Sequence, residues 1–225
     1  MAEKAIITRV HTSPLALDAA AWNALLAQQA HATPFMRHEY LAALHASGSA
    51  VPATGWHPHY VTLEQDGVLI AACPLYLKEH SYGEYVFDWA WADAYQRHGL
   101  RYYPKLLVAV PFTPVPGSRL LATDDAARHT LLAGLAQVAE DEDAPPVHLL
   151  FHEPDETRVI AAQGWLARQG VQFHWTQDPA APHADFGAFL ASLQRDKRKK
   201  IQQERRRVAE AGVTFTVHEA DQIDA

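Results

Sequence analysis

The stretch YVTLEQDGVLIAACPLYL, residues 60–77, decides the fold class of this chain. It holds two β-rich runs, residues 60–63 and residues 68–77, and the EQDG segment between them ends in the Asp-Gly pair that is typical of a hairpin turn. The first run alternates in polarity, which predicts a strand with one face in solvent. The second run is almost wholly apolar, which predicts a strand near the centre of a sheet.

Helices and further strands are expected on both sides of this hairpin. Before it we expect a strand at residues 5–10 and helices at about residues 18–29 and 35–46, the first capped by Asp18. After it we expect the strands and helices that follow: a strand at 106–110, a helix at 124–142, a strand at 147–151, a helix at 156–169 and strands at 171–175 and 213–217. This order predicts an α/β fold, a mixed sheet flanked by helices on both faces.

Composition indicates an ordinary globular protein. The chain has 225 residues, of which 48% are hydrophobic and 20% charged. No apolar run reaches membrane-spanning length, and the first ten residues have no signal-peptide core, so we expect no membrane span and a cytoplasmic location. The single cysteine, Cys73, lies in an apolar run and is expected to be a small buried residue.

The fourteen histidines raise the question of a metal site. His57 and His59 would share one face of a strand, and His148 and His152 would lie near each other. Neither pair has a cysteine or glutamate at ligand spacing nearby, so we expect no metal and interpret these residues as surface or hydrogen-bonded histidines.

Charge is concentrated near the end of the chain. Residues 196–207 hold seven basic and two acidic residues, a net charge of +5 in a chain whose formal net charge is −7. This segment predicts a basic helix on an otherwise acidic protein. Such a helix attracts phosphate groups, although a solvated charged face is the commoner role.

The densest chemistry lies in residues 80–119, which read HSYGEYVFDWAWADAYQRHGLRYYPKLLVAVPFTPVPGSR. Aromatic rings, carboxylates, imidazoles and guanidiniums gather there more than a purely structural segment requires. If residues 82–91 were extended, Glu84 and Asp88 would share one face and four aromatic residues the other. Carboxylates over such an aromatic floor would have raised pKa values. The alternative is a core strand whose acids pair with Arg97, Arg101 or Lys105.

Candidate roles follow from these residue types. Carboxylate and imidazole groups can act as bases, and aromatic and cationic side chains can bind a ligand. The candidate catalytic residues are Glu84, Asp88, Asp93 and His80, and the candidate substrate-binding residues are Tyr82, Tyr85, Trp89, Trp91, Tyr95, Arg97, His98, Arg101, Tyr102, Tyr103 and Lys105.

Four segments carry a resemblance to a known family: the block at residues 80–107, VPFTPVPGSRLL, QFHW and KRKKIQQERRRV. With them the chain resembles the FemAB-like peptidoglycan biosynthesis/recognition family of N-acyltransferases, whose members have two GNAT-like halves. The resemblance implies a first GNAT-like domain at residues 1–178. It also implies a linker, a basic helix and the first strand of a second half at residues 179–225, so we expect the N-terminal part of a longer chain.

The resemblance also implies co-substrates and partners. We expect no permanently bound cofactor, and acyl-CoA or aminoacyl-tRNA as the donor of an acyl group to an amine of a peptidoglycan precursor or similar small molecule. In GNAT enzymes the junction occupied here by residues 111–119 holds the pyrophosphate of acyl-CoA, but Pro114 and Pro116 lack N–H donors. The candidate cofactor-binding residues are Thr113, Gly117, Arg119, Lys197, Arg198 and Arg205.

Two other functions stay open. A recognition module of GNAT-like fold would bind a glycan or peptide on the aromatic surface without chemistry. A nucleic-acid-binding protein would use the basic helix, with tRNA as the expected partner and an affinity that falls steeply with salt. A chain with half of the family's architecture is also expected to pair with a second copy as a homodimer.

Overall fold

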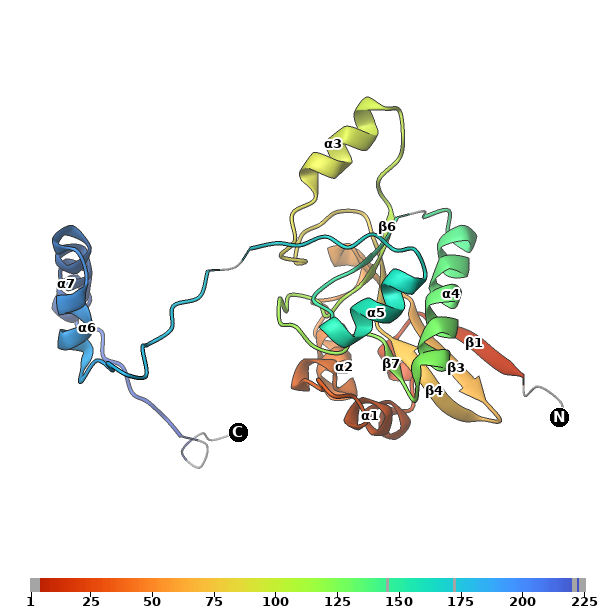
Figure 1. Cartoon of the computed structure of the whole chain (residues 1–225), viewed down its shortest axis with the longest axis horizontal. Helices are drawn as coiled ribbons and strands as arrows, with labels where there is room; N and C mark the ends of the chain where they lie inside the picture. Colours follow the sequence, from red (N-terminus) through yellow and green to blue (C-terminus); the bar gives the residue numbers. More distant parts are fainter. Residues whose placement is uncertain (1–4, 145, 172, 220–221, 223–225) are drawn as a thin grey trace. The chain divides into compact units, whose positions relative to one another are not determined.

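The computed structural model describes residues 5–144, 146–171, 173–219 and 222. The chain forms two compact units, residues 1–168 and residues 169–225. The strands of the first unit are β1 Ile6–His11, β2 Trp56–Pro58, β3 Tyr60–Gln65, β4 Val68–Cys73, β5 Leu75–Lys78, β6 Lys105–Val108, β7 Leu121–Ala122 and β8 Val147–Leu149 (Figure 1). Its α-helices are α1 Ala19–Ala27, α2 His38–Ala46, α3 Trp89–Arg97, α4 Asp125–Asp141 and α5 Pro154–Ala162.

The hairpin expected at residues 60–77 is confirmed. Strands β3 and β4 pair antiparallel with Gln65 opposite Val68. Asp66 and Gly67 make the turn with φ angles of 52° and 78°. Two successive positive φ angles are those of a type I′ turn, whose twist matches that of the flanking strands, and this is why Asp-Gly is favoured there.

The strands form two sheets of four, and β4 of the first sheet leads through Pro74 into β5 of the second. The first sheet has the order β1-β3-β4-β7 and is antiparallel, while the second has the order β2-β5-β6-β8, in which β6 and β8 are parallel. Pro74 separates β4 from β5, because proline has no N–H for the ladder. Across this break the His59 N–H donates to the Leu75 carbonyl at 2.7 Å. Parallel and antiparallel pairs together confirm the expected mixed arrangement.

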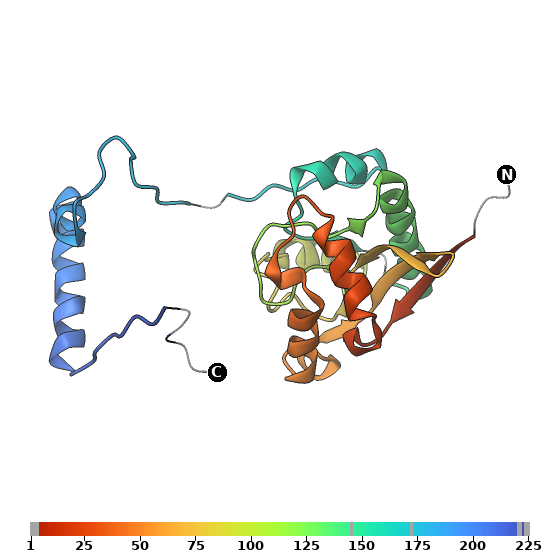
Figure 2. The same ribbon diagram turned by 90° about the horizontal axis from the view of Figure 1, so that it is seen from below.

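Helices cover both faces of these strands, as expected. Along β4 to β6, successive buried residues alternate between two apolar clusters, one packed on α4 and α5 and the other on α1 and α2 (Figure 2). Cys73 and Leu106 belong to the first cluster, and Ala72 and Leu107 belong to the second. The alternation follows from the two-residue period of a strand. Cys73 is fully buried, which confirms its expected role, and burial raises the pKa of its thiol well above the ordinary range.

Helix caps were predicted well, and helix lengths less well. Asp18 and Asp124 cap α1 and α4 by accepting backbone N–H groups, as their positions in the sequence predict. The helix expected at residues 35–46 is interrupted at Arg37, where ψ is 144°, so that a short 3₁₀ turn, η2 Pro34–Met36, precedes α2. Helix α5 ends seven residues before the expected position, because Gly164 turns the chain with a φ of 78°.

Residues 79–104 form an insertion between β5 and β6 and contain α3, which stands away from the strands in Figure 1. The extended conformation considered for residues 82–91 is wrong. Gly83 and Tyr85 have φ angles of 80° and 60°, which end any strand, and α3 begins at Trp89. The good helix former alanine recurs at every second position from 90 to 94 and favours this helix.

The second unit is helical where it is regular. It contains α6 Phe186–Ser192, capped by Asp185, and the basic helix α7 Arg195–Glu210. The strands expected at residues 171–175 and 213–217 are absent from the described part of this unit, and Gln172 lies outside it. A lone strand has no ladder partner and is not stable. The expected domain boundary at residues 178 and 179 stays a prediction. Within the described residues, no helix is long and apolar enough to cross a membrane.

Candidate functional site

Lys105, the first residue of β6, lies at the centre of a buried charge cluster. Its Nζ donates to Glu84 Oε2 at 2.8 Å and also to Asp88 Oδ2. The three residues are at most 4% exposed. Two carboxylates and one ammonium out of water require close pairing, since an unpaired buried charge is strongly destabilising.

The conformation of the insertion brings the two acids to this lysine. Gly83 has a positive φ, and its carbonyl accepts the Phe112 N–H at 3.0 Å. A Cβ at Gly83 would lie 2.6 Å from Phe112 Cε1, so only glycine allows this close approach. The next residue, Glu84, is buried and its carboxylate reaches Lys105.

Two tyrosines complete the coordination of Asp88. The Tyr102 hydroxyl donates to Asp88 Oδ2 at 2.9 Å, and the Tyr103 hydroxyl donates to Asp88 Oδ1 at 2.8 Å. Burial by itself raises the pKa of Asp88, but the Lys105 ammonium and the two hydroxyls outweigh it and lower that pKa to about 2. Burial and the hydrogen bond to Asp88 raise the pKa of Tyr102 above its usual range. Asp88 is therefore a fixed negative charge.

Glu84 behaves differently from Asp88. Burial raises its pKa, and the attraction of Lys105 offsets only part of that effect. Its Oε1 atom is buried and has no hydrogen-bond partner among the described residues. Two neighbouring carboxyl groups whose environments push their pKa values apart are a common arrangement in acid–base catalysis, where one holds a proton and the other a charge.

Two further titratable residues lie beside this cluster: Lys78 was not singled out from the sequence, and His148 was weighed there only as a metal ligand or a surface or hydrogen-bonded histidine. Lys78 of β5 is fully buried, with its Nζ 3.6 Å from the centroid of the Trp56 ring and 3.2 Å from the Tyr82 carbonyl. Burial lowers the pKa of Lys78 to about 8. His148 of β8 places its Nε2 3.3 Å from the Tyr102 hydroxyl. The signal for both is a polar residue within an apolar strand, which needs a buried partner.

The structure brings together five of the predicted site residues: Glu84, Asp88, Tyr102, Tyr103 and Lys105. The pairing of the acids with Lys105, considered as the structural alternative, is confirmed. The expected aromatic floor beneath them is wrong, because Tyr85, Phe87, Trp89 and Trp91 are exposed. Their exposure follows from the helix and the turns that replace the extended strand.

The remaining predicted residues of the insertion lie outside the cluster. Asp93 and Arg97 form an exposed ion pair along α3, and His98 ends that helix. Arg101 pairs with Asp143 at 2.5 Å. Tyr95 packs edge-on against Tyr102 at 5.1 Å between ring centroids, and His80 packs against Tyr82 at 5.0 Å. Catalytic roles for Asp93 and His80 stay predictions.

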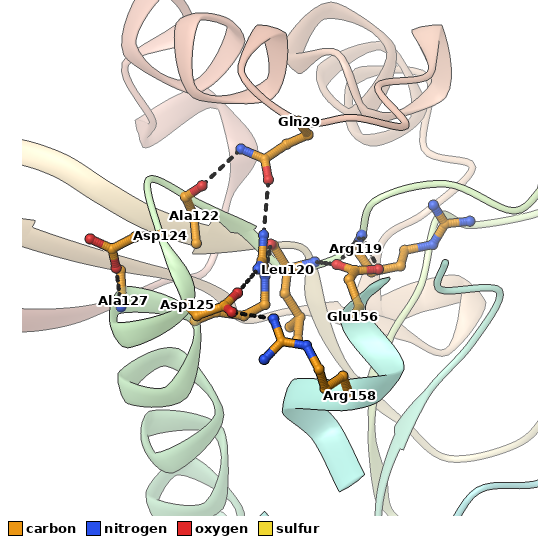
Figure 3. Close-up of polar contacts among 10 residues, drawn as sticks. Gln29, Arg119, Leu120, Ala122, Asp124, Asp125, Ala127, Glu156 and Arg158 are labelled. Carbon is orange, nitrogen blue, oxygen red and sulfur yellow. Dashed lines mark hydrogen bonds and ion pairs between the residues drawn. The ribbon is translucent and has the colours of Figure 1, made fainter. Parts of the chain in front are cut away.

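The loop at residues 111–119 is held by the protein itself. Arg119 is 1% exposed, and its guanidinium donates to the carbonyls of Leu150, Gly117 and Val115. Its backbone N–H and that of Leu120 donate to the Glu156 carboxylate (Figure 3). Thr113 donates its hydroxyl to the Pro111 carbonyl at 2.9 Å, and the Gly117 N–H donates to the Phe151 carbonyl at 3.0 Å. Contact of these residues with a cofactor would require the loop to rearrange.

The basic residues of the second unit are more accessible. Lys197 is exposed on α7, and Arg198 donates to the Ala191 carbonyl at 3.3 Å. The Arg205 guanidinium lies 4.6 Å from the centroid of the Phe186 ring, a cation–π contact that leaves its charge available. No group of three or more metal-ligating side chains occurs in the described part of the chain.

Comparison with known proteins gives one family and several distant structures. A family model, FemAB-like and described as peptidoglycan biosynthesis/recognition, matches residues 14–225. None of the curated proteins compared with the chain matches it. The chain is similar in structure to the aminoglycoside N-acetyltransferase AAC(6')-Iy in complex with CoA, at 14% identity and a TM-score of 0.46, over 78% of this chain and 97% of that one. It is also similar to the ribosomal-protein-alanine N-acetyltransferase from Brucella melitensis biovar Abortus 2308, at 16% identity and a TM-score of 0.44, over 76% and 99%.

Proposed function

The chain belongs to the FemAB-like family of peptidoglycan biosynthesis and recognition, and from this membership we propose that it is an N-acyltransferase acting on an amine of a peptidoglycan precursor. The observation that carries the proposal is the buried cluster of Glu84, Asp88 and Lys105. In it one carboxyl group has a raised pKa and its neighbour a lowered one. Neighbouring carboxyl groups whose pKa values are pushed apart are typical of acid–base sites, and Asp88 supplies a fixed negative charge.

The acids act through the side chains that they hold. Glu84 and Asp88 are too deeply buried to touch a substrate, whereas Tyr103 is half-buried and donates directly to Asp88. We assign Glu84 and Asp88 as positioning residues and Lys105 as the charge that keeps them together. The tyrosine ring of Tyr103 and the exposed aromatic residues of the insertion are proposed to contact the acceptor.

The donor is proposed to be acyl-CoA or aminoacyl-tRNA, bound through its phosphates. Helix α7 carries the exposed positive charge that such a donor requires, with Lys197, Arg198 and Arg205 as its proposed contacts. Replacing these three residues by alanine is expected to raise the KM for the donor and to reduce its dependence on salt, while the KM for the acceptor stays unchanged.

A recognition module without catalysis is the second candidate function. Tyr82, Phe87 and Trp89 are 71%, 70% and 63% exposed. Exposure of such large aromatic side chains to water is unfavourable, and it is unusual unless a ligand covers them. The family's description itself includes recognition. Such a module would bind a muropeptide but release no product.

The test combines the two functions in one assay. The wild-type chain is incubated with acetyl-CoA, or in parallel with alanyl-tRNA, and with a soluble peptidoglycan precursor that carries a free amine. Thiol release and the mass of the precursor report transfer, and calorimetry reports binding. Asp88→Asn is expected to lower kcat/KM at least about 100-fold, and Glu140→Gln, on the exposed surface of α4, is the control. Binding of the precursor without any product would instead favour the recognition module.

Three further points of the proposal concern organisation. Residues 1–178 are proposed as the first GNAT-like domain and residues 179–225 as the start of a second half. The reaction is proposed to take place in the cytoplasm, and two copies of the chain are proposed to form a homodimer. A monomeric sedimentation profile across micromolar concentrations would contradict the dimer.

A further inference from the structure

His148 links the buried cluster to its half-buried surroundings. It lies on β8 opposite Leu107 of β6, and its own side chain is only half-buried. Its ring meets that of Tyr102 edge-on, with 5.8 Å between the centroids. The imidazole is therefore the end of a chain of side chains that runs from Lys105 and Asp88 through Tyr102.

The directions of the hydrogen bonds fix the tautomer of His148. Asp88 is a carboxylate and can only accept hydrogen bonds, so the Tyr102 hydroxyl donates its single hydrogen to Asp88 Oδ2. The oxygen of Tyr102 must then accept from His148 Nε2, which lies 3.3 Å away. A neutral imidazole with a hydrogen on Nε2 has its lone pair on Nδ1. No described residue forms a hydrogen bond with Nδ1. This atom is also not one of the buried side-chain atoms that lack a hydrogen-bond partner.

The surroundings of His148 keep it neutral. Burial lowers its pKa to about 4, and the charges of Lys105 on β6 and Arg168 after α5 act in the same direction. Asp88 in the insertion opposes them. At neutral pH the side chain is therefore an uncharged imidazole, which is the form that accepts a proton.

We infer that His148 is the proton acceptor of the acyl transfer, an inference that rests on the proposed function. The amine nitrogen attacks the acyl carbon, the new N–C bond forms, and the bond from that carbon to the donor sulfur or oxygen breaks. The amine proton passes to His148 Nδ1, and from there to the departing thiolate or alkoxide. As the imidazole becomes positive, its Nε2–H strengthens the bond to Tyr102, whose hydroxyl is fixed by the negative Asp88.

The activity test uses a substitution that keeps the hydrogen bond and removes the base. His148→Gln retains an N–H for Tyr102, and His129→Gln is the control, because His129 is also half-buried and forms a hydrogen bond with Gln163. With acetyl-CoA and the precursor as probes, His148→Gln is expected to lower kcat about 100- to 10,000-fold with little change in KM. Tyr102→Phe is expected to shift the acid limb of the kcat/KM profile.

A second measurement reads the imidazole without catalysis. Nitrogen-15 NMR of the wild-type chain is expected to show His148 neutral at pH 7 with hydrogen on Nε2, and Tyr102→Phe is expected to mix the tautomers. Transfer activity that survives in His148→Gln overturns this inference and leaves the proposed function standing. A wild-type chain with the expected tautomer but no transfer to any probe overturns the proposed function and the base with it. A cationic ring or hydrogen on Nδ1 at pH 7 overturns the inference alone.

Discussion

The Oε1 atom of Glu156 lies 2.6 Å from the backbone nitrogen of Leu120, so a side chain of α5 fixes the start of β7 (Figure 3). The same carboxylate accepts the backbone N–H groups of Arg119 at 2.9 Å and of Glu153 at 3.2 Å. Glu156 is fully buried, and burial raises its pKa although the backbone donors lower it. One side chain thereby satisfies three backbone donors that would otherwise be buried without a partner.

We predict that Glu156→Met destabilises the first unit by about 3 kcal/mol or more. Methionine has a similar length but accepts no backbone hydrogen bonds, and each buried donor left unpaired costs about 1–3 kcal/mol. Urea unfolding followed by tryptophan fluorescence measures the loss. Glu140→Met on exposed α4 surface is the control, with an expected change within about 0.5 kcal/mol. Equal effects of the two substitutions would contradict the role assigned to Glu156.

Local signals in the sequence predicted the frame of the fold. Asp66-Gly67 fixed the hairpin because few other pairs adopt two positive φ angles, and Asp18 and Asp124 marked helix starts because their side chains accept N–H groups. The conformation of the insertion at residues 79–104 was predicted less well. Tyr85 adopts a positive φ that nothing in its residue type demands, so the turn before α3 depends on tertiary contacts.

The site shows the same division between local and tertiary information. The pairing of Glu84 and Asp88 with Lys105 was weighed from residue types alone, because buried acids need a cation. His148 joined the cluster only through the parallel register of β8 with β6, which no local pattern specifies. The engagement of Arg119 by backbone carbonyls likewise depends on β8 and the loop lying together.

We predict that Lys105→Met destabilises the protein by about 3–5 kcal/mol. Removing the ammonium leaves two carboxylates buried without their cation, which is the costly way to break a buried ion pair. Arg97→Met is the control, because it breaks an exposed pair with Asp93 and should cost at most about 1 kcal/mol. Chemical denaturation at pH 7 compares the two. A loss at Lys105 as small as that at Arg97 would show that the cluster contributes little to the fold.

We predict that His148 makes the protein less stable as the pH falls from about 6.5 to about 4. The pKa of His148 is about 4 in the folded chain and 6.5 when unperturbed, so in this window the unfolded chain binds a proton that the folded chain does not. The resulting loss is about 2 kcal/mol after allowance for its half-buried position. Unfolding free energies of the wild type and His148→Gln, measured from pH 7 to pH 4, isolate this part. A difference between them that stays constant with pH would refute the prediction.

Glycine at position 83 provides the last prediction, since it separates the cost of a close contact from that of a positive φ. Both Gly83 and Gly99 have positive φ angles, but a Cβ at Gly83 would lie 2.6 Å from Phe112, whereas a Cβ at Gly99 would meet nothing within 4 Å. We expect Gly99→Ala to cost about 1 kcal/mol for the φ alone. Gly83→Ala should cost about 2–4 kcal/mol, because Phe112 must also move. It should further lower transfer activity, since Glu84 follows directly. Similar losses at both positions, measured by urea unfolding, would mean that the insertion tolerates displacement and that its packing on Phe112 does not hold Glu84 in place.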